Sequence, residues 1–303
     1  MRRASGRSMR VRRTVAVGVA ALCAGTLAAC GSPTPQAGVA TVIVTETAGV
    51  PAATSQASVP RTAASARALA ASFEELSRTL SAPVGLALVP VGGGPVAVFG
   101  DQTPRVAWST IKVPLAIAAE RRNGPSDAEA NAIIDSDNAA AEQLWSSLGT
   151  PDQAAAAVTR VLREGGDKTS TVPSHRLRPE FSIFGQTTWA LGDAATFAAD
   201  LPCLGGTDHV ISLMGRVAGN QQWGLKAIES RATAVKGGWG PSGTGGYLVR
   251  QLGLLTRKDG RQVGVAMSTQ TAAGSMEPGA AVLSAVGRWL AQHLSALPAG
   301  RCR

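Results

Sequence analysis

Apolar residues recur at two different spacings along this chain, and the order of these spacings predicts its first elements. Leu69, Phe73 and Leu76 follow one another at helical spacing and predict an amphipathic helix over 67–80. Two short apolar runs come next, VGLALVP and PVAVFG, separated by VGGG, and they predict a β-hairpin. The folded part of the chain therefore begins with a helix and two strands.

The rest of the pattern is helical in the middle of the chain and returns to strands near its C-terminus. The predicted elements are helices over 129–149, 151–162 and 191–204, an irregular connection over 164–190, strands over 232–238, 245–256 and 262–270, and a last helix over 278–297. Because strands from both chain ends can complete one sheet, we expect an α+β fold, a mostly antiparallel sheet flanked by helices plus an inserted all-helical lobe. The helical lobe is expected at about 109–205, the α/β lobe at 65–108 and 206–303, and a ligand cleft between them.

The first 29 residues have the pattern of a bacterial lipoprotein signal peptide. Six arginines and no acidic residue precede position 14, and the apolar run of 16 residues that follows is shorter than a membrane span of about 20. LAAC at 27–30 resembles the lipobox, which implies that Cys30 becomes the acylated first residue; an ordinary signal peptide with a chance cysteine is the alternative. The composition of 30–64 predicts a lipid-anchored flexible tether, and so a domain at the extracytoplasmic face of the cell membrane.

The net charge of +9 does not indicate a nucleic-acid-binding protein. Without the six N-terminal arginines, the chain holds 23 basic and 20 acidic residues. No basic stripe with interleaved aromatic residues accompanies this small excess. We therefore expect no nucleic-acid partner. Separately, we expect the protein to be a monomer.

The cysteines and histidines predict a disulfide and no metal site. Cys23 lies inside the signal peptide, so the exported domain keeps Cys203 and Cys302 as a candidate pair in an oxidising compartment. Two free thiols are the alternative. The histidines, at 175, 209 and 293, are scattered and lack His-Glu-x-x-His spacing, so we expect neither a catalytic metal nor a cofactor.

Three short motifs carry the candidate chemistry. Ser109-x-x-Lys112 stands where a loop gives way to a helix, Ser136-Asp137-Asn138 occurs in the helical middle, and Lys236-Gly237-Gly238 ends a strand-like run. Each motif alone is a weak signal, but their order and placement match S-x-x-K, S-D-N and K-T-G of β-lactamases and penicillin-binding proteins. Over about residues 65–300 the chain therefore resembles the penicillin-recognising serine hydrolases, class A β-lactamases most closely.

The resemblance and the chemistry of these residue types imply roles in acyl transfer. Ser109, at a helix N-terminus, is the nucleophile, and Lys112 is its base if burial and the charge of Lys236 lower the Lys112 pKa. Ser136 relays a proton to the leaving nitrogen. The positions implied to contact substrate are Asn138, Gly237, Gly238 and Trp239, the last through its backbone N–H in the oxyanion hole. A helix-capping Ser109 and a solvated Lys236 are the alternatives without chemistry.

The third motif departs from the family pattern at the position that grips the substrate carboxylate. Gly237 stands where the family has threonine or serine, so that hydroxyl is missing, and Thr244 and Arg250 are the candidates to replace it. Only 27 positions separate Ser109 from Ser136, which predicts a trimmed helical lobe and a cleft more open on that side.

The segment expected to carry the deacylation base also departs from the family pattern. The resemblance implies a glutamate in an Ω-loop, and the candidate here is Glu180, with Phe184 in place of the asparagine that helps hold the water. Glu180 is either this general base or a surface or ion-paired glutamate. Without a base, the acyl-enzyme would persist, as in a penicillin-binding protein.

Two hypotheses of function follow from these residues. The first is a membrane-anchored serine hydrolase that acts on β-lactams or D-alanyl peptide-like substrates. The second is a catalytically degenerate relative that binds cell-wall peptide or a protein partner in the envelope. A His-dependent α/β-hydrolase is disfavoured, because Gly-x-Ser-x-Gly is absent.

Overall fold

The computed structural model of the protein describes residues 61–303. The predicted signal peptide, the lipid attachment site at Cys30 and nearly all of the predicted tether lie outside the described residues. The helices are α1 (Arg61–Thr79), α2 (Lys112–Asn123), α3 (Asp127–Ile134), α4 (Asn138–Ser147), α5 (Pro151–Glu164), α6 (Leu191–Asp200), α7 (Asp208–Gly215) and α8 (Glu277–Gln292). The strands are β1 (Val84–Pro90), β2 (Ala97–Gly100), β3 (Arg105–Val106), β4 (Thr188–Trp189), β5 (Thr233–Pro241), β6 (Tyr247–Thr256) and β7 (Gln262–Thr271).

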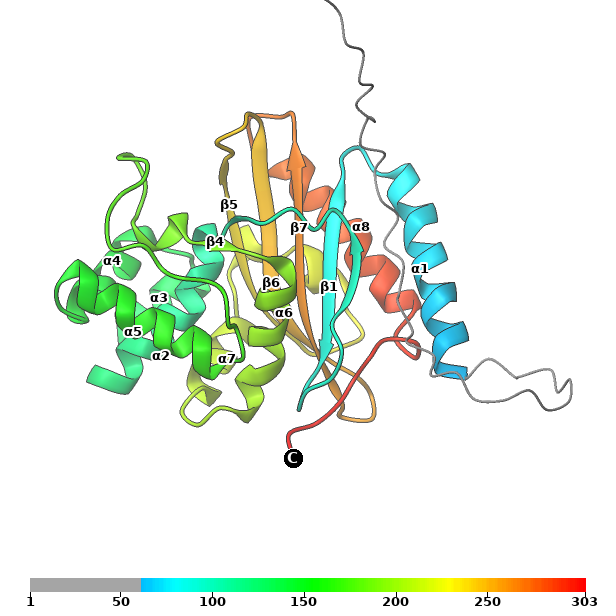
Figure 1. The fold of residues 1–303 in the computed structure, drawn as a ribbon, viewed down its shortest axis with the longest axis horizontal. Coiled ribbons are helices and arrows are strands. Elements are labelled where there is room, and N and C mark those ends of the chain that lie inside the picture. The colour runs from blue at the N-terminus through cyan, green and yellow to red at the C-terminus, as the bar shows by residue number, and fades with distance from the viewer. Residues whose placement is uncertain (1–60) are drawn as a thin grey trace, which may run out of the picture. The chain divides into compact units, whose positions relative to one another are not determined.

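Five strands from the two ends of this sequence form one antiparallel sheet, in the order β2-β1-β7-β6-β5 (Figure 1). β1 pairs with β7 along its whole length, and Leu86 lies opposite Met267. The short strands β3 and β4 pair separately. The predicted α+β fold, with an antiparallel sheet completed by distant parts of the chain, is confirmed.

Both faces of the sheet are buried under helices. α1 and α8 pack on one face and α6 packs on the other (Figure 1). Successive side chains of a strand point to opposite faces, so β1 contributes to two cores. Leu86 and Leu88 pack in the core with α1 and α8, whereas Ala87 and Val89 pack in the core with α6. This double burial explains why β1 is apolar along its whole length.

Five helices, α2, α3, α4, α5 and α7, pack against one another beside the edge strand β5 (Figure 1). The alanines that make this region helical in the sequence pattern also let its helices approach closely, and several of them are fully buried: Ala116, Ala132, Ala141 and Ala154. β5 contacts both α7 and the turn that begins α2. The edge of the sheet at β5 is therefore where strand and helices meet.

The predicted single helix over 129–149 is wrong, because the chain breaks between α3 and α4. Ser136 has a φ of 59°, which no helix can continue through. Asp137 then starts the next helix, since its carboxylate accepts a hydrogen bond of 2.6 Å from the backbone N–H of Ala140. The break turns the middle motif into a loop between two helices, in which Ser136 is buried while Asp137 and Asn138 are exposed. β5 differs too, since it does not end at Lys236–Gly238 but continues to Pro241.

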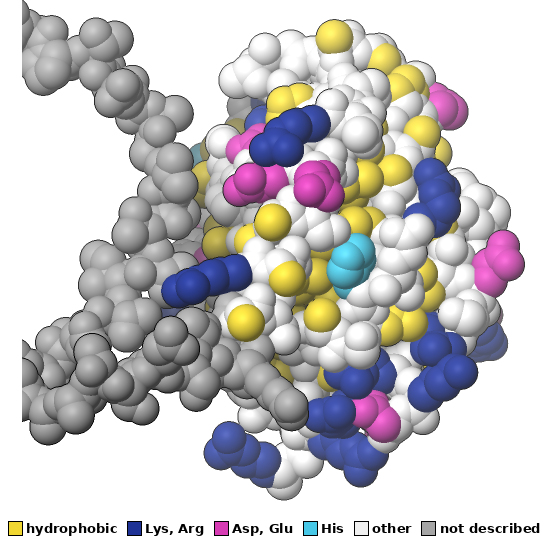
Figure 2. Space-filling model, turned by 90° about the vertical axis from the view of Figure 1, so that its right-hand side faces the viewer, with side chains coloured by type: hydrophobic (Ala, Val, Ile, Leu, Met, Phe, Trp, Pro, Cys, Tyr) yellow, Lys and Arg dark blue, Asp and Glu magenta, His cyan; other side chains and the backbone are white. Residues whose placement is uncertain are grey.

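The surface shown in Figure 2 carries basic and acidic side chains together, with Lys and Arg gathered toward one end of that face. In the turn between β6 and β7, Arg257 and Arg261 both pair with the carboxylate of Asp259, at 3.5 and 2.8 Å.

From residue 61 to the C-terminus, no helix combines the length and apolarity needed to cross a membrane.

The predicted disulfide between Cys203 and Cys302 is present. It joins the short turn after α6 to the C-terminal segment, across 99 positions of sequence. Since it ties the end of the chain back to a helix that packs on the sheet, it restricts the unfolded chain strongly.

We expect the Cys203→Ser/Cys302→Ser double variant to lose about 2–4 kcal/mol of unfolding free energy, because the open chain regains the entropy of a long loop. Urea denaturation followed by circular dichroism measures the loss. The control is reductant, which should destabilise the wild type by a similar amount and leave the double variant unchanged. Equal urea midpoints for the two proteins would show that the bridge contributes nothing.

Candidate functional site

Ser109 lies in a single 3₁₀ turn, Trp108–Ile111, that leads directly into α2. The first N–H groups of such a turn have no partner within it, so the Ser109 N–H is available to a ligand. Trp108, just before it, has a φ of 47°, a conformation that costs a bulky residue on the order of 1–3 kcal/mol. The indole of Trp108 packs against the backbone of Gly240 in β5 and edge-on against Phe181, at 4.8 Å between ring centres. These contacts hold the strained turn in place.

Lys112 lies one turn after Ser109 and reaches into the loop between α3 and α4. Its Nζ donates to the carbonyl oxygens of Ser136 and Asp137, at 2.6 and 3.1 Å, and to Oδ1 of Asn138 at 2.8 Å. Burial lowers the pKa of Lys112 to about 8, against the opposing charges of Asp137 and Glu142. Among the described residues no hydrogen bond joins Ser109 Oγ to this amine, a contact that catalytic groups often make only when substrate is bound.

Lys236, in β5, holds the hydroxyl of Ser136 from the opposite side. Its Nζ donates to Ser136 Oγ at 2.8 Å, to Oε1 of Gln221 at 2.6 Å and to the carbonyl of Gly237 at 2.9 Å. The side chain is fully buried, and burial together with the charge of Lys112 holds the Lys236 pKa well below that of an ordinary lysine. Ser136 therefore accepts from one lysine through its hydroxyl and from the other through its carbonyl.

The second glycine of the third motif is required by a close approach between β5 and the nucleophile turn. A Cβ on Gly238 would lie 2.9 Å from the backbone nitrogens of Ser109 and Thr110 and from the carbonyl oxygen of Ala107. The strand thus passes directly beside the Ser109 N–H. The next residue is Trp239, whose backbone N–H is the predicted second donor of the oxyanion hole.

Gly237, the first glycine of the motif, is required by a different contact, with an aromatic ring. A Cβ on Gly237 would lie 2.7 Å from the indole of Trp223 and 3.3 Å from that of Trp239. The two indoles pack edge to face, with ring centres 6.4 Å apart. Trp223 therefore occupies the space that a threonine or serine side chain at position 237 would need.

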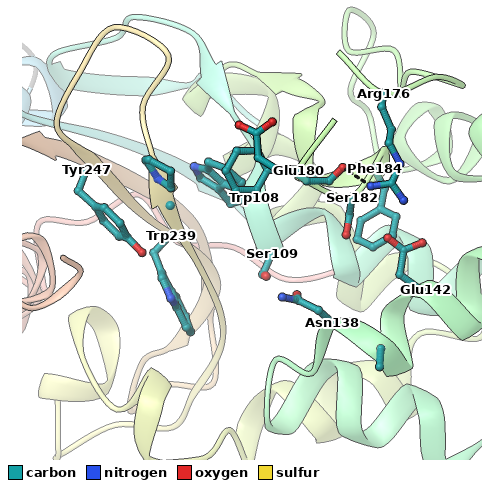
Figure 3. Close-up of a pocket in the computed structure, with 15 residues that line it drawn as sticks. Trp108, Ser109, Asn138, Glu142, Arg176, Glu180, Ser182, Phe184, Trp239 and Tyr247 are labelled. Atoms are coloured by element: carbon teal, nitrogen blue, oxygen red, sulfur yellow. Dashed lines mark hydrogen bonds between the residues drawn. The ribbon is translucent and has the colours of Figure 1, made fainter. Parts of the chain in front are cut away.

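These elements surround a cleft of about 510 Å³ that opens on Ser109 (Figure 3). Ser109 lies between Trp239 on one side and Asn138 on the other, and the Asn138 amide points toward it. The far wall is formed by Glu142 of α4 and by Phe184 from the long connection. The cleft thus combines Ser109, the predicted nucleophile, with an amide, a carboxylate and several aromatic rings.

Glu180 lines the mouth of this cleft, and its carboxylate points away from Ser109 (Figure 3). It pairs with Arg178 at 3.2 Å, and its side chain is 54% exposed. Arg178 stacks on Phe181 and donates to the carbonyl of Pro241 at 2.9 Å, which holds the pair at the outer surface. Of the two readings of Glu180, the ion-paired surface residue is the one that this geometry favours.

Arg250 and Thr244, the candidates to bind a substrate carboxylate, do not line the cleft. The guanidinium of Arg250 is buried and donates to three backbone carbonyls, those of Arg105, Val106 and Trp189, at 3.0–3.1 Å. It therefore joins β6 to the ladder of β3 and β4. Thr244 is exposed in the turn after β5, where its hydroxyl lies 3.1 Å from the Gln270 amide.

The sequence analysis missed Gln221, which positions Lys236. Its buried amide accepts from Lys236 Nζ and, at 2.9 Å, from the backbone N–H of Gly237, and it donates to the carbonyls of Ile133 and Ile134 at 3.0 and 2.8 Å. One side chain thus links β5 to the end of α3. No local pattern marks a glutamine in an irregular segment as a network centre, because its partners lie far away in the sequence.

Solved structures with the same fold come from β-lactamases and a penicillin-binding protein. TLA-3 extended-spectrum β-lactamase is 14% identical, with a TM-score of 0.59 and coverage of 75% of this chain and 99% of that chain. PBP-A is 19% identical, with a TM-score of 0.59 and coverage of 76% and 97%. The chromosome-encoded β-lactamase of Vibrio parahaemolyticus is 14% identical, with a TM-score of 0.57 and coverage of 75% and 98%.

No protein-family model and no curated protein sequence matches this chain. The structural similarity confirms the predicted resemblance to the β-lactamase and penicillin-binding superfamily at the level of the fold. At these identities the likeness extends to the arrangement of helices and strands, so the chemistry must be argued from this chain's own residues.

We expect Gln221→Leu to lower the unfolding free energy by about 2–4 kcal/mol, because it removes an acceptor from buried Lys236 and leaves the carbonyls of Ile133 and Ile134 unpaired. Urea denaturation measures the change. The control is Gln292→Leu, an exposed glutamine at the end of α8, which should stay within about 0.5 kcal/mol of wild type. Equal losses in the two variants would contradict the linking role of Gln221.

Proposed function

We propose that this chain is a serine acyltransferase or hydrolase of the penicillin-recognising type, in which Ser109 takes the acyl group of a β-lactam or of a D-alanyl peptide-like substrate. One observation carries the proposal. Two buried lysines, both with lowered pKa values, converge on Ser136 beside a serine whose N–H is free. Burying two amines carries a desolvation free-energy cost, which their mutual arrangement does little to offset in the folded state, so a functional role explains it better than stability does.

In the proposed reaction, neutral Lys112 takes the hydroxyl proton of Ser109 while Ser109 Oγ forms a bond to the substrate carbonyl carbon. The backbone N–H groups of Ser109 and Trp239 stabilise the negative charge that develops on the carbonyl oxygen. The C–N bond then breaks, and the departing nitrogen takes a proton from Ser136 Oγ. Ser136 recovers a proton from the ammonium of Lys112, with Lys236 holding its hydroxyl in place. The products are an acyl ester on Ser109 and a free amine.

Hydrolysis of the acyl ester, the second half of a hydrolase cycle, has less support from the residues of the site, so we propose a long-lived acyl-enzyme. A deacylation base must face a water beside the ester, but Glu180 pairs outward with Arg178. Buried Phe184 offers no hydrogen bond to such a water. Penicillin-binding proteins behave in this way. A similar structure, of a point mutant of PBP-A, is an acyl-enzyme complex with penicillin G; it is 19% identical to this chain, with a TM-score of 0.58.

A non-catalytic binding protein is the second candidate, and the aromatic rings at β5 favour it. Trp223 fills the space beside Gly237, so the substrate-gripping hydroxyl of the third motif has no counterpart there. The cleft walls include Trp108, Phe181 and Trp239, which suit stacking on a flat or apolar ligand. In this alternative the ligand binds reversibly and Ser109 is not acylated.

We further propose that the protein works at the outer face of the cell membrane as a lipoprotein anchored through Cys30. The LAAC motif and the tether composition support this proposal. The location suits the chemistry, since cell-wall peptides and β-lactams are both found outside the cytoplasm.

We expect a fluorescent penicillin to label the wild type covalently and Ser109→Ala at least about 1000-fold more slowly, because the nucleophile is lost. In-gel fluorescence and intact mass measure the labelling. Ser146→Ala, at an exposed position of α4, is the control that should label as wild type does. Saturable but non-covalent binding that Ser109→Ala retains would replace the hydrolase with the binding protein.

The same experiment, followed in time, tests the role of Glu180. After removal of free penicillin, the adduct should persist for hours, and Glu180→Gln should change its half-life by less than about twofold, because the carboxylate is engaged outside the cleft. A half-life that lengthens tenfold or more in Glu180→Gln would identify Glu180 as the deacylation base.

The acylation rate should rise with pH and level off above the Lys112 pKa of about 8, because only the neutral amine accepts the Ser109 proton. At pH 7 about one tenth of Lys112 is neutral, so the rate should fall roughly tenfold for each pH unit below 7. Stopped-flow measurement of penicillin labelling from pH 5.5 to 9.5 gives this profile.

Two variants control the pH experiment. Lys112→Arg should be inactive across the whole range, since a guanidinium does not lose its proton. Lys168→Arg, at an exposed position, should keep the wild-type profile. A wild-type rate that does not vary between pH 6 and 9 would contradict Lys112 as the base.

A further inference from the structure

A second cluster of ionisable side chains lies outside the cleft, where α2, α3 and α7 pack together. Glu120 comes from the end of α2, Glu129 from α3 and His209 from the first turn of α7. Nδ1 of His209 lies 3.2 Å from Oε1 of Glu129 and 3.6 Å from Oε2 of Glu120. One ligand atom from each residue lies within 4.8 Å of the other two.

Glu129 is buried, and four polar atoms of the three residues are buried without a hydrogen-bond partner. The side chain of Glu129 is 1% exposed, and neither of its carboxylate oxygens accepts a hydrogen bond from an N–H group or a hydroxyl. Over the described part of the chain, nine buried side-chain atoms have no hydrogen-bond partner, and four of them belong to these three residues. Buried polar atoms are satisfied in nearly all proteins, so this concentration requires an explanation.

We propose that Glu120, Glu129 and His209 bind a divalent zinc ion that joins the three helices. Zn²⁺ takes nitrogen and carboxylate ligands in tetrahedral geometry at about 2.0–2.2 Å, which places neighbouring ligand atoms about 3.3–3.6 Å apart. The 3.2 and 3.6 Å separations around His209 Nδ1 are close to these edges. The imidazole favours zinc over magnesium and calcium, which prefer oxygen ligands.

The surroundings fit an ion that is held away from the cleft. His209 is 37% exposed while its Nδ1 is buried, so the exposed part of the ring lies away from the carboxylates. Glu120 lies eight positions after Lys112 on α2, about 12 Å along the helix, and none of the three residues lines the cleft. The ion would therefore not take part in acyl transfer.

The fold gives such an ion a mechanical role. α2 begins at Lys112, and α3 leads directly into the loop that holds Ser136 and Asn138. An ion bound between the far end of α2 and the start of α3 would fix the two helices that carry the first and second motifs. It would also join them to α7, which contacts β5.

The competing explanation is a cluster that shares protons and binds no metal. Burial raises the pKa of Glu129 to about 8, with further contributions to that value from a proton shared with the neighbouring Glu120 carboxyl group and from the negative charge of Glu120. In that state one proton lies between the two carboxyl groups, and the cluster is satisfied without an ion.

Zinc titration of the full-length protein, stripped with a chelator and dialysed, separates the two explanations. We expect one equivalent of Zn²⁺ to bind by isothermal titration calorimetry, and the Tm to rise by about 5 °C or more at saturating zinc. Glu129→Gln and His209→Gln should each weaken binding by at least about 100-fold, since each removes a ligand. These measurements need no substrate, so they hold whether or not the proposed function does.

Matched controls are Glu75→Gln, an exposed glutamate of α1, and His175→Gln, an exposed histidine of the long connection. Both should bind zinc as the wild type does. If Glu129→Gln does not fold, His209→Gln decides the test, because His209 is partly exposed. The absence of saturable binding, or binding that both ligand variants retain, overturns the proposal and leaves the proton-sharing cluster.

Discussion

The burial of two lysine amines beside one serine is the constraint on which the rest of this structure depends. Removing one partner from a buried cation costs several kcal/mol, so each amine must have acceptors on all sides. Lys112 finds them in the loop between α3 and α4, and Lys236 finds them in Ser136, Gln221 and its own strand. These acceptors come from the helical region and from the sheet. The hydrogen bonds of the two amines therefore fix the position of the helices relative to β5.

The glycines of β5 are matched by aromatic residues that fill the space beside them, so the missing hydroxyl of the third motif is accompanied by specific packing. Gly237 leaves room for Trp223, Gly240 leaves room for Trp108, and Gly238 lets the strand pass beside the Ser109 N–H. Each glycine is matched to a specific neighbour, so a threonine restored at 237 would displace an indole. Position 237 therefore packs against an indole and offers the cleft no hydroxyl, while the strand still passes directly beside the Ser109 N–H.

Periodicity and motif order predicted most of the fold, and tertiary contacts account for what they missed. The strands and their pairing across the chain follow from apolar runs, because both faces of the sheet are buried. The break at Ser136 could not be read from an alanine-rich segment that favours helix throughout. Gln221 and the cluster of Glu120, Glu129 and His209 escaped because their partners lie far apart in sequence. Arg250 was predicted as a candidate to bind the substrate carboxylate, because the sequence does not show that its guanidinium donates to buried backbone carbonyls instead.

Backbone strain is confined to the part of the site that would form the acyl-enzyme in the proposed reaction. In the described chain the two non-glycine residues at positive φ are Trp108 and Ser136; the first directly precedes Ser109 and the second lies in the loop that binds Lys112. Their strain is offset by the contacts that present the Ser109 N–H and hold the Ser136 hydroxyl, which are the groups needed to form an acyl-enzyme. No comparable device surrounds Glu180, whose carboxylate is half exposed and ion-paired at the surface. In the proposed mechanism, the strained residues therefore support the capture of an acyl group, and neither of them supports its release.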